Sequence, residues 1–157
     1  MDEYIAQLQK LGKNTDKAIG SGVYAMAGVV ADAVRQSIES LSVGATEQEN
    51  IAAYRAGKKS KLTKKEKDGL LDGLGISAAQ NEGGYFNVKI GFSGYNSVKT
   101  KKYPGGQPNV LIARITESGS PYRDKTPFMR TAVARAREEA LKKGQAAIDA
   151  EIAALQE

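Results

Sequence analysis

The sequence contains no cysteine, no histidine and no tryptophan. Because cysteine is absent, a small secreted fold held together by disulfides is excluded. The absence of both cysteine and histidine excludes the usual structural zinc sites. It also removes the Ser–His and Cys–His pairs in which a neighbouring base activates a nucleophile. We therefore expect a protein that is not an enzyme and that carries no cofactor and no metal.

Two groups of polar residues remain as candidates for chemistry. Three acidic residues lie close together in the sequence: Glu66, Asp68 and Asp72. Their spacing does not match an EF-hand loop, so solvation and capping of a helix is the favoured interpretation. Three serines are candidate nucleophiles: Ser77, Ser118 and Ser120. They have no histidine to activate them and lie in no Ser-x-x-Lys signature, so a catalytic serine is not expected.

Aromatic residues make up only 6% of the chain, so the core must consist mainly of valine, isoleucine, leucine and alanine. A length of 157 residues, 41% of them hydrophobic, is enough for one domain with a modest core. We expect a single domain over residues 1–157, with a basic and flexible insertion at about residues 43–62. Helical apolar faces on so small a core also predict burial against other copies of the chain.

Long hydrophobic runs are missing as well. The most apolar run, residues 23–34, contains Asp32 and is shorter than the ~20 residues that cross a bilayer. The first residues are acidic, whereas a signal peptide begins with basic ones. These features predict a soluble intracellular protein without a membrane partner. The formal net charge of +5 is compatible with nucleic acid or with an acidic protein surface.

The first 41 residues repeat apolar positions in steps of three and four, which predicts a long N-terminal helix over residues 2–41. A kink or break is expected at residues 12–14, where Gly12 precedes Lys13 and Asn14. Three more glycines lie inside the helical pattern: Gly20, Gly22 and Gly28. Each costs ~1 kcal/mol relative to alanine in an exposed helix. Close packing of helices or subunits is the favoured explanation for them.

The middle of the chain is polar and basic. Residues 42–62 predict a long mobile loop, with a short helix possible at residues 47–54. A dense group of cations follows from its second half onward: Arg55, Lys58, Lys59, Lys61, Lys64 and Lys65. Such a group suits phosphate contacts, but a solvated loop or a loop that meets an acidic partner is the favoured interpretation. Thr63 and Glu66 form a capping-box pattern that predicts a short helix to about Leu71.

The clearest strand covers residues 85–92, where apolar and polar residues alternate. Residues 76–80 are its expected hairpin partner, with residues 81–84 as the turn. Residues 109–118 fit either a short helix that begins after Pro108 or a buried strand, and we favour the helix.

Residues 113–133 specify a change of direction. Gly119 ends one element, a polar loop crosses, and a long helix follows over residues 126–156, with Thr126 as its cap and Pro127 in its first turn. Phe128 is expected to anchor this helix in the core. The complete pattern predicts an α+β fold with a long N-terminal helix, a small antiparallel β-sheet and a long C-terminal helix.

The same region carries a family resemblance. It contains Ala113-Arg114 in an apolar run, then Glu117-Ser118-Gly119-Ser120, a polar loop, and Pro127-Phe128-Met129-Arg130-Thr131-Ala132 before a charged helix. In this order the motifs resemble a family of small tailed-bacteriophage proteins, variously called head–tail joining, tail-completion or minor tail proteins. Ser120 replaces the usual threonine of that family. The family's Pro-x-x-Thr-Gly-x-Leu segment before the hairpin is replaced here by residues 67–71.

The resemblance implies a structural protein of the virion, assembled in a bacterial host as a homo-oligomeric ring in the neck or tail. Its partners would be other neck and tail proteins, and the basic loops would face packaged DNA or an acidic neighbouring ring. Five residues are the expected subunit contacts: Arg114, Glu117, Tyr122, Arg123 and Arg130. Three are expected as structural anchors: Gly119, Pro127 and Phe128. The alternative is a nucleic-acid-binding accessory protein that uses the basic cluster.

Overall fold

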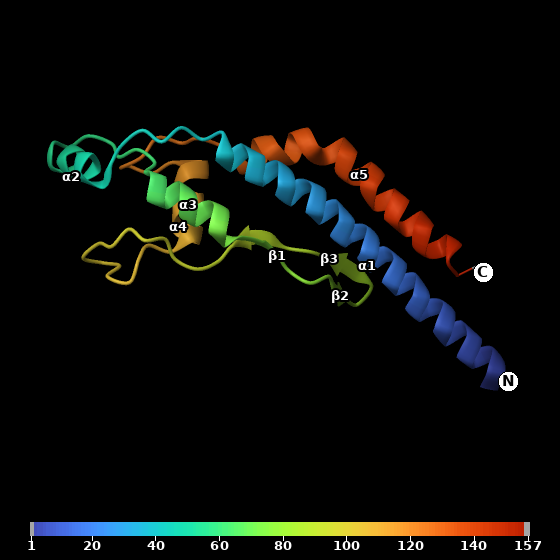
Figure 1. Ribbon diagram of the computed structural model, residues 1–157. Coiled ribbons are helices and arrows are strands. Elements are labelled where there is room, and N and C mark those ends of the chain that lie inside the picture. Colours follow the sequence, from blue (N-terminus) through green and yellow to red (C-terminus); the bar gives the residue numbers. More distant parts are fainter. Residues whose placement is uncertain (1, 156–157) are drawn as a thin grey trace. The chain divides into compact units, whose positions relative to one another are not determined.

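The computed structural model describes residues 2–155 and confirms an α+β fold (Figure 1). The described elements follow in the order α1 (Asp2–Glu39), α2 (Glu47–Arg55), α3 (Lys64–Gly73), β1 (Leu74–Ile76), β2 (Gln80–Glu82), β3 (Tyr85–Asn87), β4 (Ile90–Phe92), α4 (Asn109–Ser118) and α5 (Met129–Ala153). Strands β2 and β3 form one two-stranded sheet, and β1 and β4 form another. Among residues 2–155 no helix is both long and apolar enough to cross a membrane.

Contacts between Cα atoms divide the chain into two compact units. Within the described residues, unit 1 comprises residues 2–30, 76–89 and 136–155. Unit 2 comprises residues 31–75 and 90–135.

In unit 1, α1 and α5 approach each other closely at a pair of glycines. A Cβ atom placed on Gly22 would lie 2.5 Å from Cγ1 of Ile148, and one on Gly144 would collide with the side chain of Met26. Only glycine fits where two helix backbones come this near. The packing explanation is therefore confirmed for Gly22. It does not hold for Gly28, where a Cβ would meet nothing within 4 Å.

The predicted break at residues 12–14 is wrong, because α1 continues through them without interruption. The hydroxyl of Thr15 donates to the carbonyl oxygen of Leu11 at 2.9 Å, one helical turn earlier. A glycine lowers helix stability by ~1 kcal/mol but does not by itself end a helix whose neighbours keep helical geometry.

The hairpin of unit 1 is displaced from the predicted one. Its strands are β2 and β3, which pair antiparallel with Glu82 opposite Tyr85. Gly83 and Gly84 therefore form a two-residue turn, with φ of 64° and 92°. Two consecutive residues with positive φ match the twist of a tight hairpin, which favours this turn over a four-residue connection. The predicted partner, residues 76–80, is correct only at its two ends: Gln80 pairs with Asn87, and Ile76 belongs to β1, which pairs with β4.

The predicted single strand over residues 85–92 is also wrong, because it is divided into β3 and β4. The separating Lys89 is engaged locally with Ser77: its carbonyl oxygen accepts from the Ser77 amide at 2.8 Å, and its own amide donates to Ser77 Oγ at 2.9 Å. The alternation of apolar residues suits both strands, so sequence periodicity did not reveal that they pair with different partners.

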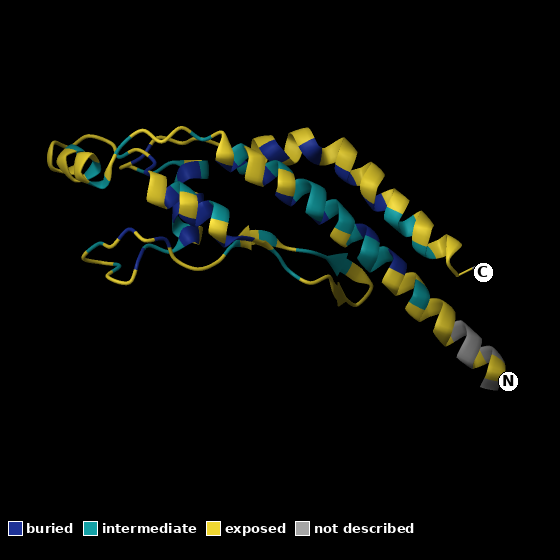
Figure 2. Cartoon of the chain, viewed as in Figure 1, coloured by how far each residue is buried: buried dark blue, intermediate teal, exposed yellow. Residues whose placement is uncertain are grey.

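The core of unit 2 contains the largest fully buried side chains: Val34, Ile38, Leu70, Ile112 and Phe128. They come from three helices, α1, α3 and α4, and from the residue just before α5, and Figure 2 shows dark blue positions on these elements. The ring of Phe92 from β4 packs edge-on against that of Phe128, with 6.1 Å between the ring centroids. The helix predicted at residues 109–118 is confirmed as α4.

Helix α3 packs against α4 through its glycines. A Cβ on Gly73 would lie 2.7 Å from Nδ2 of Asn109, and a Cβ on Gly69 would lie 2.5 Å from Oδ1 of the same side chain. Asn109 is 2% exposed, and its amide nitrogen donates to the carbonyl oxygen of Ser93 at 2.9 Å. This polar side chain thus connects α4 with the segment that follows β4.

Helix α5 begins at Met129, not at the predicted Thr126, so Pro127 lies outside its first turn. The amide of Ala132 donates to the carbonyl oxygen of Phe128 at 3.1 Å, which makes Phe128 the residue that precedes the first helical position. The amide of Thr126 donates a hydrogen bond to the carbonyl oxygen of Thr116 at 2.6 Å. The cap is the carboxylate of Glu117, eleven residues before Phe128, and a local capping pattern cannot show an acceptor at that separation.

Candidate functional site

The junction between α4 and α5 is organised by the carboxylate of Glu117. Its Oε2 accepts from the amides of Phe128 and Met129, each at 2.8 Å, and its Oε1 accepts from the amide of Arg130 at 3.2 Å. The Nε of Arg130 donates to the same Oε1 at 3.0 Å. Amides at a helix start have no partner within the helix and carry partial positive charge, which explains why a carboxylate lies there.

These hydrogen bonds set the acidity of Glu117. Burial alone would raise its pKa. The bonds from the Met129 amide, the Arg130 side chain and the Arg130 and Phe128 amides together outweigh burial, so the pKa of Glu117 lies below its ordinary value. The carboxylate is therefore held in its charged form at neutral pH, as an electrostatic cap requires.

The loop between the two helices folds back on the middle of the chain. Gly119 follows α4 with φ of 77°, a conformation that favours glycine. Ser120 and Arg123 then exchange backbone hydrogen bonds across a tight turn, at 2.8 and 3.2 Å. The amide of Ser60 donates to the carbonyl oxygen of Tyr122 at 2.7 Å. Residues 120–123 and the segment around Ser60 are thereby tied together.

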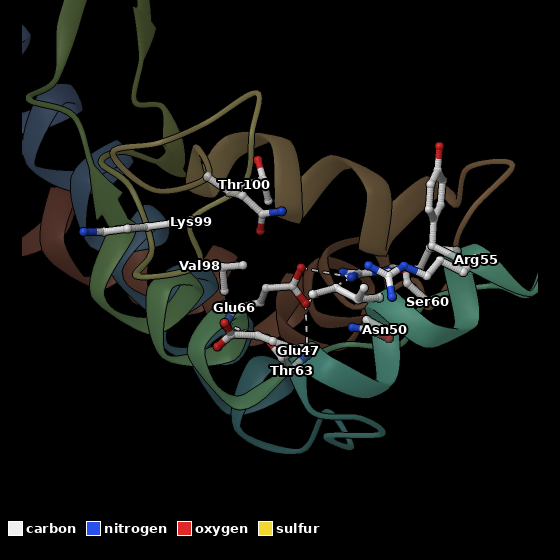
Figure 3. Close-up of a pocket in the computed structure, with 13 residues that line it drawn as sticks. Glu47, Asn50, Arg55, Ser60, Thr63, Glu66, Val98, Lys99 and Thr100 are labelled. Atoms are coloured by element: carbon white, nitrogen blue, oxygen red, sulfur yellow. Dashed lines mark hydrogen bonds and ion pairs between the residues drawn. The ribbon is translucent and has the colours of Figure 1, made fainter.

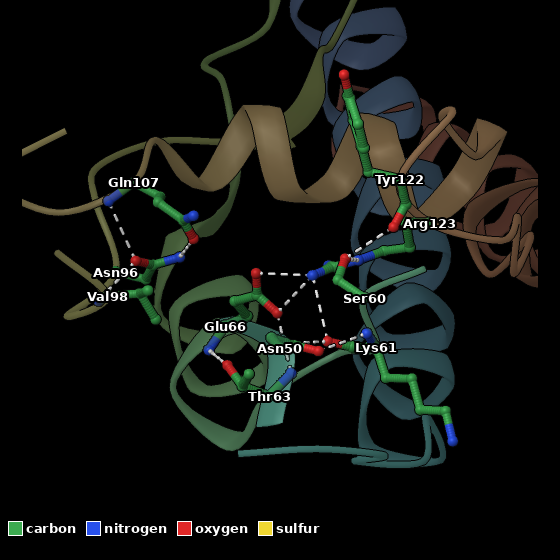
Figure 4. Close-up of polar contacts among 10 residues, drawn as sticks. All are labelled: Asn50, Ser60, Lys61, Thr63, Glu66, Asn96, Val98, Gln107, Tyr122 and Arg123. Atoms are coloured by element: carbon green, nitrogen blue, oxygen red, sulfur yellow. Dashed lines mark hydrogen bonds and ion pairs between the residues drawn. The ribbon is translucent and has the colours of Figure 1, made fainter. Parts of the chain in front are cut away.

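Arg123 forms a buried ion pair with Glu66 (Figure 4). Its Nη2 lies 2.9 and 3.0 Å from the two oxygens of the Glu66 carboxylate, and the side chains are 7% and 4% exposed. The same nitrogen donates to the carbonyl oxygen of Lys61 at 3.2 Å, and Nε donates to Ser60 Oγ at 3.3 Å. The remaining nitrogen, Nη1, is buried and has no hydrogen-bond partner among the described residues.

Glu66 has a second task at the start of α3. Its Oε2 accepts from the amide of Thr63 at 2.9 Å, while the hydroxyl of Thr63 accepts from the amide of Glu66 at 3.2 Å. This is the predicted capping box, and it is confirmed. One carboxylate therefore both caps α3 and neutralises Arg123.

A cavity of about 430 Å³ opens beside this ion pair (Figure 3). One face of α2 supplies the first part of its lining: Glu47, Asn50, Ile51, Tyr54 and Arg55. The segment after β4 supplies the second: Val98, Lys99, Thr100 and Gln107. The residues around the ion pair supply the third: Ser60, Thr63, Glu66 and Arg123. A volume of this size is within the range of small-ligand sites, and the lining combines apolar, polar and charged groups.

The polar network continues along the second wall. Asn96 is 5% exposed, and its Oδ1 accepts from the amides of Val98 and Gln107 at 2.9 and 3.2 Å. These bonds fix the backbone on both sides of the loop at residues 99–106. Val98 is thereby held as a buried apolar residue in the cavity wall.

The basic segment predicted as a flexible insertion contains α2 and is attached to the rest of unit 2. The attachment is made by Ser60, whose amide and hydroxyl both donate to the carbonyl oxygen of Tyr122, at 2.7 and 3.0 Å. Within the segment, Asn50 exchanges two hydrogen bonds with the backbone of Lys61, at 2.8 and 2.9 Å. Helix α2 has its own capping box, in which Thr46 and Glu49 bond one another, and these bonds lower the pKa of Glu49. The pattern Thr46-x-x-Glu49 is the same signal that located α3, and sequence reasoning missed it.

Several predicted basic residues are engaged with carboxylates. Lys59 pairs with Asp124, Lys64 pairs with Asp68 at 2.6 Å, and Lys65 pairs with Glu47 at 2.7 Å. The other three predicted cations, Arg55, Lys58 and Lys61, form no ion pair within residues 2–155. The cluster is therefore a surface of mixed charge.

The residues predicted as subunit contacts separate into two groups. Arg114, Tyr122 and Arg130 are exposed, although Arg130 also pairs with Glu117 and the ring of Tyr122 contacts that of Tyr54. Glu117 and Arg123 are committed inside the chain, and Arg123 is only 6% exposed, too little to form a subunit contact. Arg123 lies alone in a polar loop, which favours a surface position for it. Its partner Glu66 lies 57 positions away in the sequence, so the local pattern does not show the ion pair.

The anchors and the acidic group can be placed as well. Phe128 is 1% exposed, as predicted, whereas Pro127 is exposed. The acidic residues 66, 68 and 72 make no common site, because Glu66 pairs with Arg123 and Asp68 with Lys64. In the part of the chain that the structure describes, no group of three or more acidic residues could hold a metal ion.

Comparisons of the chain with protein-family models, with curated proteins and with solved structures gave no match.

Proposed function

We propose that the protein is a structural subunit of a tailed bacteriophage or prophage, acting in the neck or tail as part of a homo-oligomeric ring. The observation that supports this most is the role of the family-like pattern. Glu117 caps α5, Gly119 allows the reversal and Phe128 fills the core, so these three motif residues serve the backbone path. Because these residues build the junction between α4 and α5 and form no reactive site, they favour a structural protein over an enzyme.

Exposed apolar side chains support an oligomer. In unit 1 they include Leu11 at 60%, Tyr24 at 51% and Leu141 at 55% exposure. Large apolar residues on helices that have no cover within their own unit are typical of interfaces between subunits. A second copy of the chain is the proposed partner for these helices.

Sedimentation and particle composition test the proposal together. The purified chain, alone or with proteins encoded beside it, is expected to sediment as a ring-sized species, and mass spectrometry of purified particles should detect it. A chain that remains monomeric at all concentrations and is missing from particles would remove the proposal.

Nucleic-acid binding is the second candidate, supported by Arg55, Lys58 and Lys61, which form no ion pair with the described part of the chain. Since three other lysines of the cluster already pair with carboxylates, we expect weak and strongly salt-dependent binding. Fluorescence anisotropy with a labelled duplex would measure it at low and moderate salt. An unchanged anisotropy at low salt would exclude this candidate.

A further inference from the structure

Helix α2 stands apart from the other helices of unit 2 in its burial. None of its residues is buried, and Figure 2 shows it without dark blue positions. Ile51 and Tyr54 are 53% and 66% exposed, yet both line the cavity beside the Arg123–Glu66 pair. The ring of Tyr54 lies 5.9 Å from that of Tyr122 between centroids, but Ile51 stays uncovered beside the cavity, which points to an occupant of this face.

One of the lining residues, Arg123, has a hydrogen-bond donor that is buried and unused within the described residues. Arg123 lines the cavity with a side chain that is 7% exposed, and its Nη1 has no partner among the described residues. A buried donor without a partner costs free energy, which a suitable acceptor recovers. Because Glu66 already neutralises the guanidinium, a neutral carbonyl oxygen suits this position better than a second carboxylate.

The charges at the surface of the cavity favour acidic groups. Arg55 and Lys99 are exposed, form no ion pair within residues 2–155, and are seen on opposite sides in Figure 3. The two lining carboxylates, Glu47 and Glu66, are each already paired with a cation. The positive charge that is left without a partner among the described residues is therefore that of Arg55 and Lys99. The same lining contains the apolar side chains of Ile51, Tyr54 and Val98.

We infer that this cavity is a docking site for an extended peptide segment of a neighbouring assembly protein, in which an apolar residue is flanked by acidic ones. A backbone carbonyl of the segment accepts from Arg123, the apolar side chain packs on Ile51, Tyr54 and Val98, and the acidic residues meet Arg55 and Lys99. The inference rests on the proposed function only for the source of the segment. The binding chemistry belongs to the cavity itself.

Titration of the full chain with capped hexapeptides, followed by amide NMR spectra, tests the inference. The first peptide has a central leucine flanked by glutamates, and the second has lysines in place of the glutamates. The glutamate peptide is expected to shift the amides of Asn50, Ile51, Tyr54 and Val98. Its affinity should exceed that of the lysine peptide at least tenfold.

Matched surface variants locate the site. Arg55→Glu should weaken the glutamate peptide at least fivefold, whereas Lys58→Glu, a charge reversal outside the lining, should change its affinity less than twofold. Ile51→Ser should abolish detectable binding, whereas Val110→Ser, an equally exposed position on α4, should leave it unchanged. All four positions are exposed, so the variants are expected to fold.

Four outcomes would overturn the inference. They are absence of binding by the glutamate peptide at millimolar concentration, equal binding of both peptides, shifts confined to unit 1, and displacement of the peptide by a single-stranded oligonucleotide that shifts the same amides. Concentration-dependent shifts without peptide would assign the cavity to a second copy instead. A chain that binds the peptide but is missing from particles would retain the docking site and lose the phage role.

Discussion

Individual carboxylates hold the critical turns of this chain. Glu117 accepts four hydrogen bonds at the start of α5, and Glu66 accepts from both Thr63 and Arg123. Each joins segments that are separated in the sequence. Their contributions to stability should differ in pH dependence and in size.

Glu117 is expected to make stability depend on pH. Because its pKa is lower in the folded chain than in the unfolded chain, its stabilising effect is complete above the unfolded pKa of about 4.3 and is lost as the pH falls through the folded pKa. Glu117→Gln should therefore reduce the unfolding free energy at pH 7, and the difference from the unmodified chain should shrink at lower pH. Urea unfolding at pH 7, 4 and 3 would measure this.

The control for that experiment is Glu138→Gln, at an exposed position of α5 with no hydrogen bond described for its side chain. Its effect should be small at every pH. A Glu117 effect that stays constant from pH 7 to pH 3 would contradict the proposed electrostatic cap.

The buried ion pair should be costly to break. Arg123→Met leaves the Glu66 carboxylate buried without its cation, which typically costs about 3–5 kcal/mol of unfolding free energy. The double variant Arg123→Met with Glu66→Gln should be more stable than Arg123→Met alone, because the buried charge is removed while a capping oxygen remains. Chemical denaturation of the three chains measures both effects.

An exposed pair of the same chemistry serves as the comparison. The side chain of Arg130 is 73% exposed where it pairs with Glu117, so Arg130→Met should cost no more than about 1 kcal/mol. Equal losses for Arg123→Met and Arg130→Met would show that burial does not determine the strength of the Arg123 contact.

At the level of elements, the contact of α1 with α5 in unit 1 depends on backbone proximity. Gly144→Ala would bring a Cβ into the side chain of Met26 and should destabilise the protein by about 1–3 kcal/mol. Gly28→Ala, in the same helix as Gly22, has open space within 4 Å and should stabilise by about 0.5–1 kcal/mol. Thermal unfolding followed by circular dichroism would detect the opposite signs, and two changes of the same sign would contradict the packing explanation.

The elements also show which parts of the secondary structure can be predicted from residues close together in the sequence. The helices α1, α3 and α4 could be predicted because apolar period, a capping box and flanking glycine and proline all act within a few residues. The start of α5 could not, since its cap comes from Glu117. The division of the strand at Lys89 was equally hidden, because it depends on pairing with Ser77, twelve residues away.

At the level of the whole molecule, exposed apolar positions on the helices of unit 1 should govern assembly. If a second copy covers them, Leu11→Glu combined with Leu141→Glu should shift the sedimentation of the chain to the monomer, since both residues are more than half exposed and their replacement leaves the core intact. Val110→Glu, similarly exposed on α4, is the matched control. Dissociation by the control alone would place the interface on unit 2.

The sequence by itself determined the exclusions and the inventory of elements: composition decides which disulfide, zinc and nucleophile chemistries are possible, and local periodicity and capping decide where helices form. Only the tertiary structure decided the environment of each side chain. Arg123 changed from an expected surface contact to a buried ion pair beside a cavity, and half of the basic cluster became paired. The reason is physical, because burial and charge pairing depend on partners such as Glu66 and Asp124 that only chain folding brings near.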